Sequence, residues 1–389
     1  TPASVLILLG VAVNAAVVPL HAWLPDAYPN ATVTGAVFMS AFTTKAAVYL
    51  LLRVFPGWEI LVWFGCAMAV YGVLYAIICK DIREILSYHI ISQVGFMVVG
   101  AGIGTELAIN GAAAHAFNNI LYKGLMFMAT GAVLYKTGTT KVAYLGGLAA
   151  RMPLVMVLYM VGGLSISGFP LFNGFISKSI LVGATGYAHY HVAAYILLLA
   201  SVGTFLSVGL KLPFMTWFDK EHSLMVLKKL PVNMYAGMAL AAFLCVFYGV
   251  VPPALYAYLP YPVDYNPFTV YDITKTMQIN LMTFAAFWVF CHKFHGELII
   301  ALDLDWFYRK PSWFFRKVFV TYVSLAFGMV EKLAYSAVGG LRRAFRDPVK
   351  WLNPITGYRH KAWSYSPSYQ VVLGLILVLY VIMELFVIS

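Results

Sequence analysis

The sequence predicts an all-α fold: a polytopic transmembrane helical bundle with discontinuous helices and a C-terminal lateral amphipathic helix. Of its 389 residues, 62% are hydrophobic and 11% are charged, and the mean hydropathy is +0.82, values far from those of soluble globular domains. Transmembrane β-strands would alternate in polarity over about ten residues. Instead, several charge-free runs reach the ~20 residues that a helix needs to cross a bilayer. These runs cover residues 60–79, 85–105, 152–177, 190–210 and 231–263.

Ten spans are predicted along the chain, and together they form one bundle rather than several domains. We expect them at residues 3–23, 32–52, 58–79, 83–104, 107–135, 153–183, 190–217, 232–258, 275–292 and 369–388. Residues 1–292 are then the bundle, 293–368 a cytoplasmic-side connector with the lateral helix, and 369–389 the C-terminal helix. Because the apolar run begins at Thr1 without the charged flank of a signal peptide, we expect that further upstream helices are missing from this sequence or are carried on another polypeptide.

Basic residues in the short loops predict the orientation of the bundle. Loops rich in Lys and Arg stay on the cytoplasmic side, so the loops after odd-numbered spans are expected there. Those loops carry Lys80, Arg83, Lys136, Lys141, Arg151, Lys220, Lys228 and Lys229. Arg53 is the one basic residue in the loops after the first three even-numbered spans.

The segment 302–351 differs from the rest because charges and aromatic residues interrupt its apolar stretches. This pattern is typical of a helix that lies along a membrane face or along neighbouring subunits. The alternative is a tilted span over 318–340, which is disfavoured because Glu331 and Lys332 would lie well inside it.

Three lysines, Lys45, Lys123 and Lys178, are the only charges in their apolar segments. Placing a lysine within a bilayer costs about 2.5–3.5 kcal/mol of free energy on insertion scales, so the presence of each of these lysines needs an explanation. An amine that is removed from water gives up its proton more readily, which makes a proton relay one reason. The alternative is structural, with the lysines capping carbonyls at helix breaks. For Lys211 the two interpretations have equal weight, since it could reach the cytoplasmic side near Asp219.

The stretch "HAFNNILYK" places His115, Asn119 and Lys123 four residues apart, on one stripe of a helix. An imidazole, an amide and an ammonium on one face could hold a file of water molecules. The alternative is a polar seam that joins helices.

A helix interruption precedes Lys178. The stretch "SISGFPLFNGFISKS" contains Gly168, Pro170, Asn173 and Gly174 in the middle of a span, which predicts unwound backbone. Such backbone is tolerated at membrane depth where it is packed in protein or faces water. An ion-handling site and a plain kink are both consistent with this pattern.

Motifs for chemistry on a substrate are absent from the sequence. It has no P-loop, nucleophile elbow, dinucleotide fingerprint or H-E-x-x-H motif, so we assign it no redox or hydrolytic chemistry of its own and no cofactor. The four cysteines form no C-x-x-C pair, and His189 and His191 lack an acidic neighbour, so we expect no metal. The basic excess lies in short loops and therefore does not predict a nucleic-acid partner.

Five stretches follow one another over about 160 residues. They are "PLHAWLPDA" (19–27), "TTKAAVYLLLR" (43–53), "KDIREILSYHIISQVGF" (80–96), "HAFNNILYKGLMF" (115–127) and "SGFPLFNGFISKSIL" (167–181). In combination they resemble the antiporter-like membrane subunits of Mrp-type cation/proton antiporters, complex I and membrane-bound hydrogenases. The resemblance implies the complex I membrane-arm fold of about fourteen helices, with two inverted repeats that each contain a broken helix.

The resemblance also implies a central row of charged residues that moves protons. Carried over by position, Lys45, Lys123 and Lys178 match relay lysines, and His115 matches a relay histidine. The secondary candidates are Asn14, Asn119, Arg83, Asp81, Lys211 and His21. Asn14 and Asn119 depart from the family pattern, in which a lysine and commonly a histidine stand at these positions.

The function implied is proton translocation within a multi-subunit cation/proton antiporter or complex I-like assembly in a plasma or inner membrane. Na⁺ is a second candidate ion, and the partners are other membrane subunits and the lipid bilayer. A looser resemblance of residues 303–310 to D-type subunits favours the Mrp branch. Two alternatives stay open: a non-conducting scaffold, for which Asn14 argues, and the proton channel of a redox-driven or inorganic-carbon uptake complex. The sequence leaves the ion and the direction of transport open.

Overall fold

The computed structural model describes residues 2–220, 229–291, 303–346 and 372–379. It divides into two compact units, one up to Asp305 and one from Trp306. In the described residues the regular structure is helical, apart from one isolated backbone bridge between Asp81 and Lys141. The all-α prediction is confirmed.

The first predicted span, 3–23, is not one continuous helix. Helix α1 (Pro2–Asn14) ends early, residues 15–22 form turns, and α2 (Trp23–Asn30) follows as a short separate helix. Ala16 has a positive φ of 56°, and Pro19 cannot donate a backbone hydrogen bond, so a helix cannot run through this stretch. The prediction of one continuous span over residues 3–23 is therefore wrong. The helix is discontinuous here, as is expected for a bundle with discontinuous helices.

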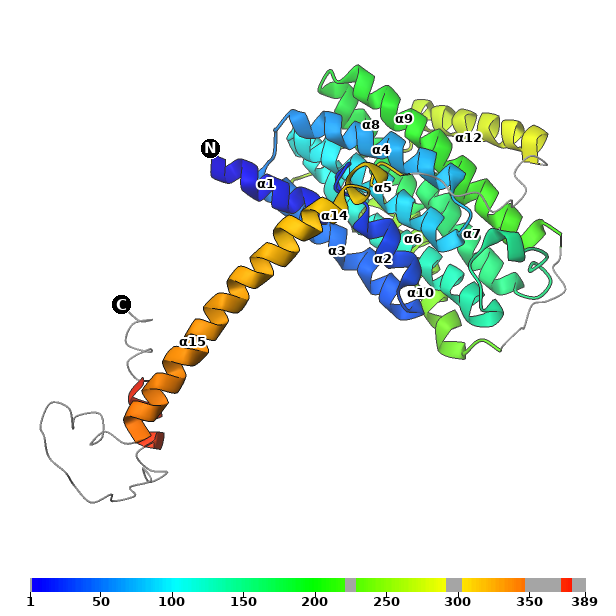
Figure 1. The fold of residues 1–389 in the computed structure, drawn as a ribbon. Helices are drawn as coiled ribbons and strands as arrows, with labels where there is room; N and C mark the ends of the chain where they lie inside the picture. The colour runs from blue at the N-terminus through cyan, green and yellow to red at the C-terminus, as the bar shows by residue number, and fades with distance from the viewer. Residues whose placement is uncertain (1, 221–228, 292–302, 347–371, 380–389) are drawn as a thin grey trace, which may run out of the picture. The chain divides into compact units, whose positions relative to one another are not determined.

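The next four helices form the centre of the first unit. They are α3 (Val33–Val54), α4 (Ile60–Ile78), α5 (Ile82–Ile103) and α6 (Glu106–Thr137). Helix α5 packs against α2, α3, α4, α6 and α8, so it is enclosed on every side (Figure 1). Nearly every residue of α5 is buried, and this helix forms the axis of the bundle.

Glycines bring α4 and α5 close together. A Cβ on Gly72 would lie 2.5 Å from the Tyr88 carbonyl oxygen, and Cβ atoms on Gly65 and Gly95 would each meet the other glycine's carbonyl at 2.6 Å. Small residues at these positions let the two backbones approach, as is common between membrane helices.

The second discontinuous helix lies where the sequence predicts it. Helix α7 (Pro153–Ser167) ends at Gly168, whose φ of 75° requires the left-handed conformation that glycine adopts easily. Helix α8 (Asn173–Tyr187) begins after four non-helical residues that follow Gly168. A Cβ on Gly174 would lie 1.8 Å from the Ser165 carbonyl oxygen, so only glycine allows the two halves to approach this closely.

Helix α9 (His191–Thr204) continues without a break into wider π turns, η2 (Phe205–Lys211) and η3 (Phe214–Phe218). The first unit is completed by three further helices and one short turn. These are α10 (Val232–Val250), α11 (Pro252–Tyr256), α12 (Val270–Phe290) and η1 (Val142–Tyr144).

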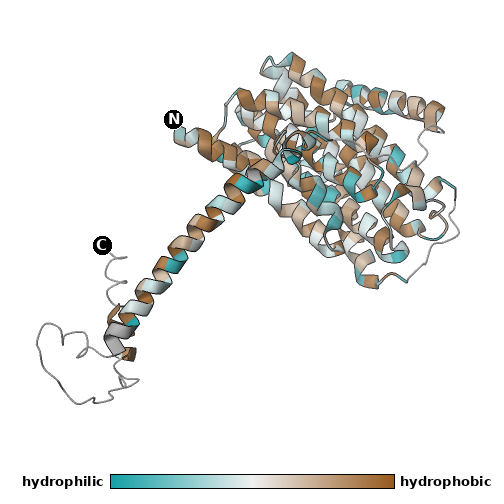
Figure 2. Cartoon of the chain, in the orientation of Figure 1, coloured by the Kyte–Doolittle hydropathy of each residue, from teal (hydrophilic) through white to brown (hydrophobic). Residues whose placement is uncertain are grey.

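The second unit contains, over residues 306–346, one long helical segment. It contains α13 (Trp306–Arg309), α14 (Ser312–Phe315), η5 (Arg316–Tyr322) and α15 (Val323–Arg346). Apolar and polar residues alternate along α15 (Figure 2). That this segment lies along the membrane, rather than crossing it, stays a prediction. The expected span 369–388 falls outside the described residues except for a helical stretch at 372–379.

Six helical segments of the described chain are long and apolar enough to cross a membrane. They are Val33–Val54, Ile60–Ile78, Ile82–Ile103, His191–Phe218, Val232–Val250 and Ser312–Arg342. Large apolar side chains such as Leu6, Phe38 and Phe243 are exposed on the first unit, and Figure 2 shows hydrophobic residues over its outer helices. Such a surface is suited to lipid.

Candidate ion path

The three lysines singled out in the sequence are all buried in the first unit. Lys45 on α3 donates to the Ser40 carbonyl oxygen at 2.7 Å, and Lys123 on α6 donates to the Leu86 carbonyl oxygen at 2.9 Å. No carboxylate lies within ion-pairing distance of either lysine in the described part of the chain.

Lys178 on α8 has a different environment. Its Nζ lies 5.3 Å from the centre of the Phe96 ring and has no hydrogen-bond partner in the described protein. A buried amine that lacks a protein partner is energetically costly unless water reaches it. Lys178 also lines a small cavity, where water could solvate it.

His115 on α6 contacts both α5 and α8. Its Nε2 lies 3.2 Å from Gln93 Oε1 on α5, and its Nδ1 lies 3.0 Å from Ser177 Oγ, next to Lys178 in the chain. Asn119 donates to the Tyr122 hydroxyl at 3.0 Å, and Tyr122 donates to the same Gln93 oxygen at 3.5 Å. The predicted stripe of α6 therefore lies in the interior, and its polar groups contact α5 and α8.

A second polar contact joins α5 to the π turns that follow α9. His89 Nε2 lies 2.6 Å from Ser207 Oγ, and Gln93 donates to Thr204 Oγ1 at 3.5 Å. The π turns widen the helix and bring Ser207 to face α5; such turns are frequent at functional sites.

Lys211 lies in the same π segment and does not reach water. Its side chain is fully buried, and Nζ donates to the carbonyl oxygens of Ile77 and Cys79, the second at 2.9 Å. These groups belong to the C-terminal end of α4, whose last carbonyls have no partner within the helix. The expectation that Lys211 could extend to the cytoplasmic surface is wrong.

Asp81 and Arg83 hold helix ends in place. Asp81 caps α5 by accepting from the backbone N–H groups of Arg83 and Glu84, and it forms an ion pair with Lys141 at 3.4 Å. The Arg83 guanidinium donates to the carbonyl oxygens of Pro29, Ala31 and Thr32 at the end of α2. These contacts support a positioning role for both residues.

His21, a secondary candidate in the turns after α1, is fully buried. Its Nε2 lies 3.2 Å from both carboxylate oxygens of Asp303, and the hydroxyls of Tyr71 and Tyr88 donate to the same carboxylate. By contrast, Asn14 is exposed as the last residue of α1.

Sequence reasoning missed several buried polar groups of the interior. His89 and Gln93 recur at i and i+4 within α5, so their spacing could have identified a polar stripe like that of His115 and Lys123. Ser177 and Ser207 carry no such pattern. Within the described residues no group of His, Cys, Asp and Glu could hold a metal ion.

The comparisons with known proteins match this architecture. The family described as "NADH:quinone oxidoreductase/Mrp antiporter, TM" matches residues 1–207. Over 191 residues the chain is 36% identical to NADH-quinone oxidoreductase subunit N of Desulforudis audaxviator, covering 46% of this chain and 38% of that protein. Over 360 residues it is 30% identical to the A-type Na⁺/H⁺ antiporter subunit of Alkalihalophilus pseudofirmus, covering 80% and 43%.

The fold is similar to that of solved membrane complexes. A chain of the Mrp complex from Dietzia sp. DQ12-45-1b aligns with a TM-score of 0.61 at 23% identity, covering 73% of this chain and 60% of that one. The chain spans less than half the length of the two curated relatives. Because the family match covers more than half of the residues of this chain, the chain belongs to the NADH:quinone oxidoreductase/Mrp antiporter family of multi-pass membrane subunits.

Proposed function

We propose that the chain is a proton-translocating subunit of a multi-subunit cation/proton antiporter in a plasma or inner membrane. The observation that carries this proposal is the burial of Lys45, Lys123 and Lys178 in one unit together with His115. Charged groups at this depth, without carboxylate partners in the described chain, are typical of ion pathways. The basic loops that follow odd-numbered spans support an orientation in which these loops face the cytoplasm.

The hydrogen bonds support an order of the groups along the proposed path. Lys123 is anchored on α5, and α5 in turn presents Gln93 to His115, which contacts Ser177 beside Lys178. A proton would move between these groups over short water bridges, since direct contacts between the lysines are not seen. Other membrane subunits would supply the driving reaction and the second ion, with Na⁺ as the ion to be tested first.

The test is transport by the assembled complex in membrane vesicles. With Lys123→Ala or Lys178→Ala, cation-dependent dissipation of a pH gradient should fall to the background of vesicles without the complex. Lys229→Ala, which removes an exposed lysine, is the control and should leave the rate unchanged. Subunit content, measured by blue native electrophoresis, checks that each variant assembles.

Full transport by both interior variants would overturn the proposal. It would favour a scaffold that keeps the fold without conducting. Replacing Na⁺ by K⁺ or choline in the same assay identifies the coupled cation.

A further inference from the structure

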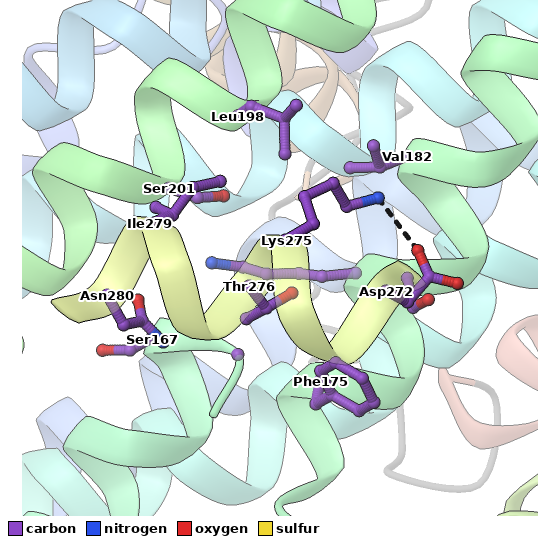
Figure 3. Close-up of a pocket in the computed structure, with 13 residues that line it drawn as sticks. Ser167, Phe175, Val182, Leu198, Ser201, Asp272, Lys275, Thr276, Ile279 and Asn280 are labelled. Atoms are coloured by element: carbon purple, nitrogen blue, oxygen red, sulfur yellow. Dashed lines mark hydrogen bonds and ion pairs between the residues drawn. The ribbon is translucent and has the colours of Figure 1, made fainter. Parts of the chain in front are cut away.

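Two charged residues of α12, Asp272 and Lys275, have no place in the path described above. Their side chains form an ion pair at 2.9 Å, one helical turn apart. Figure 3 shows the pair among the side chains that line a cavity between α8, α9 and α12. No motif in the sequence singles these two residues out.

The inner cavity leads from the pair to Lys178. It has a volume of about 40 Å³ and is lined by Lys178, Ser201, Thr276 and Asn280 besides the pair itself. A cavity needs roughly 10–15 Å³ to hold one water molecule, so this one accommodates a short file of water. The buried Asn280 amide nitrogen has no partner in the described protein, which makes it a further group that water would satisfy.

A second cavity, which we call the vestibule, also has the pair in its lining. It has a volume of about 270 Å³, and His191, Tyr195 and Ala194 line it near the surface. The vestibule and the inner cavity share Val182, Leu198, Asp272 and Lys275 as lining residues. The two cavities therefore adjoin at the ion pair, and Figure 3 shows the apolar side chains of Val182 and Leu198 beside it.

The vestibule opens at the end of the bundle where α8 ends and where α9 and α12 begin. Loops at this end follow even-numbered spans, which we expect on the outer side of the membrane. Tyr187 and Tyr195 are each 72% exposed there. A path that enters near the basic loops and reaches Lys178 needs an exit at this end.

We propose that the Asp272–Lys275 ion pair is the outer gate of the ion path, which separates the Lys178 cavity from the vestibule when closed. Opening requires that the pair separate, and water then joins the two spaces. A proton that arrives at Lys178 passes along this water to the outer side. The inference rests on the proposed function, because it gives the path from Lys178 its exit.

Asp272 also has a structural role that the test must separate. Thr269 caps α12, and the Asp272 carboxylate accepts hydrogen bonds from the hydroxyls of Thr269 at 2.9 Å and Tyr265 at 3.2 Å. Burial raises the pKa of the Tyr265 hydroxyl, which lies in a loop outside the spans, so it stays protonated and can donate. Asp272→Asn keeps an acceptor for these donors and removes the charge, whereas Asp272→Glu keeps the charge.

The experiment measures access of a small probe to the inner cavity of the full chain, in the assembled complex reconstituted in liposomes. Ser201→Cys places a thiol that lines the inner cavity and not the vestibule; Ala194→Cys places one in the vestibule alone. Ag⁺ is added from the outer side, and the thiols left unreacted are then counted by maleimide labelling after denaturation. The parent chain gives the background, since none of its four cysteines lines either cavity.

With the gate intact, the thiol of Ser201→Cys should react slowly and the thiol of Ala194→Cys rapidly. Adding Asp272→Asn should raise the first rate about tenfold, as expected when the open form becomes more populated, and leave the second unchanged. Asp272→Glu should keep the first rate low. Thr276→Cys replaces Ser201→Cys if that variant does not assemble.

The proposal is overturned if Asp272→Asn leaves the inner thiol as slow as before, or if it accelerates both thiols equally, which indicates general loosening. Labelling does not require transport. Full transport by both Lys123→Ala and Lys178→Ala would overturn the proposed function and leave the labelling result to decide the gate independently.

Discussion

His21 Nε2 lies 3.2 Å from both carboxylate oxygens of Asp303, which follows it by 282 residues in the chain. Both side chains are at least nine-tenths buried, and the hydroxyls of Tyr71 and Tyr88 contact the same carboxylate. The break after α1 is therefore joined directly to the segment that precedes the second unit. The pair holds together two regions that the sequence gives no reason to connect.

Asp303→Asn should destabilise the first unit, because the buried His21 and two tyrosine hydroxyls lose a charged acceptor. Hydrogen bonds to charged groups contribute about 1.5–3 kcal/mol, so a loss in this range is expected. Thermal unfolding of the purified complex measures the effect. Asp264→Asn, which changes an exposed loop carboxylate, is the control, and an equal shift in both variants would show that the pair adds nothing.

Gln93→Leu should slow transport without preventing assembly. The change removes the oxygen that contacts both His115 and Tyr122 while keeping a side chain of similar size. Loss of one positioned contact in a proton path is expected to reduce the transport rate about tenfold. Ile90→Leu, at a buried position of the same helix without polar contacts, is the control. An undiminished rate in Gln93→Leu would exclude Gln93 from the path.

Lys211→Met should destabilise the protein more than it impairs transport by molecules that remain folded. The substitution leaves the Ile77 and Cys79 carbonyl oxygens without their donor, at a cost of about 1–3 kcal/mol. Detergent stability of the complex and transport per assembled complex are measured side by side. If transport per complex is abolished at unchanged stability, Lys211 belongs to the ion path instead.

Gly72→Ala should prevent close packing of α4 against α5. The new Cβ would lie 2.5 Å from the Tyr88 carbonyl oxygen, and overpacking of this kind costs about 1–3 kcal/mol or more. Gly10→Ala is the matched control, since a Cβ on Gly10 meets no atom within 4 Å. Expression level and thermal stability of the two variants should differ accordingly; equal values would contradict the close approach.

Local residue chemistry predicted much of the fold. Gly168 and Pro170 predicted the break between α7 and α8, and the isolation of Lys45, Lys123 and Lys178 within apolar runs predicted their burial. These features depend on the chain within a few turns of the residue concerned. The role of the lysines in moving protons stays a prediction.

Other parts of the site depend on contacts that local sequence does not encode. The orientation of Lys211 depends on the end of α4, more than 130 residues earlier, and on the π turns that follow α9. The partner of His21 lies 282 residues further along the chain, at the far end of the first unit. Only the assembled tertiary structure brings such groups together.

The complete enclosure of α5 bears on how the chain enters the membrane. A helix that carries Arg83, His89 and Gln93 would meet lipid on every side if it left the insertion machinery alone, and polar groups in lipid are costly. Its close glycine contacts with α4, the helix made just before it, offer the first shield, and α6 supplies the next. Helices α4, α5 and α6 are therefore expected to be released into the bilayer as one group, with the polar interior already covered.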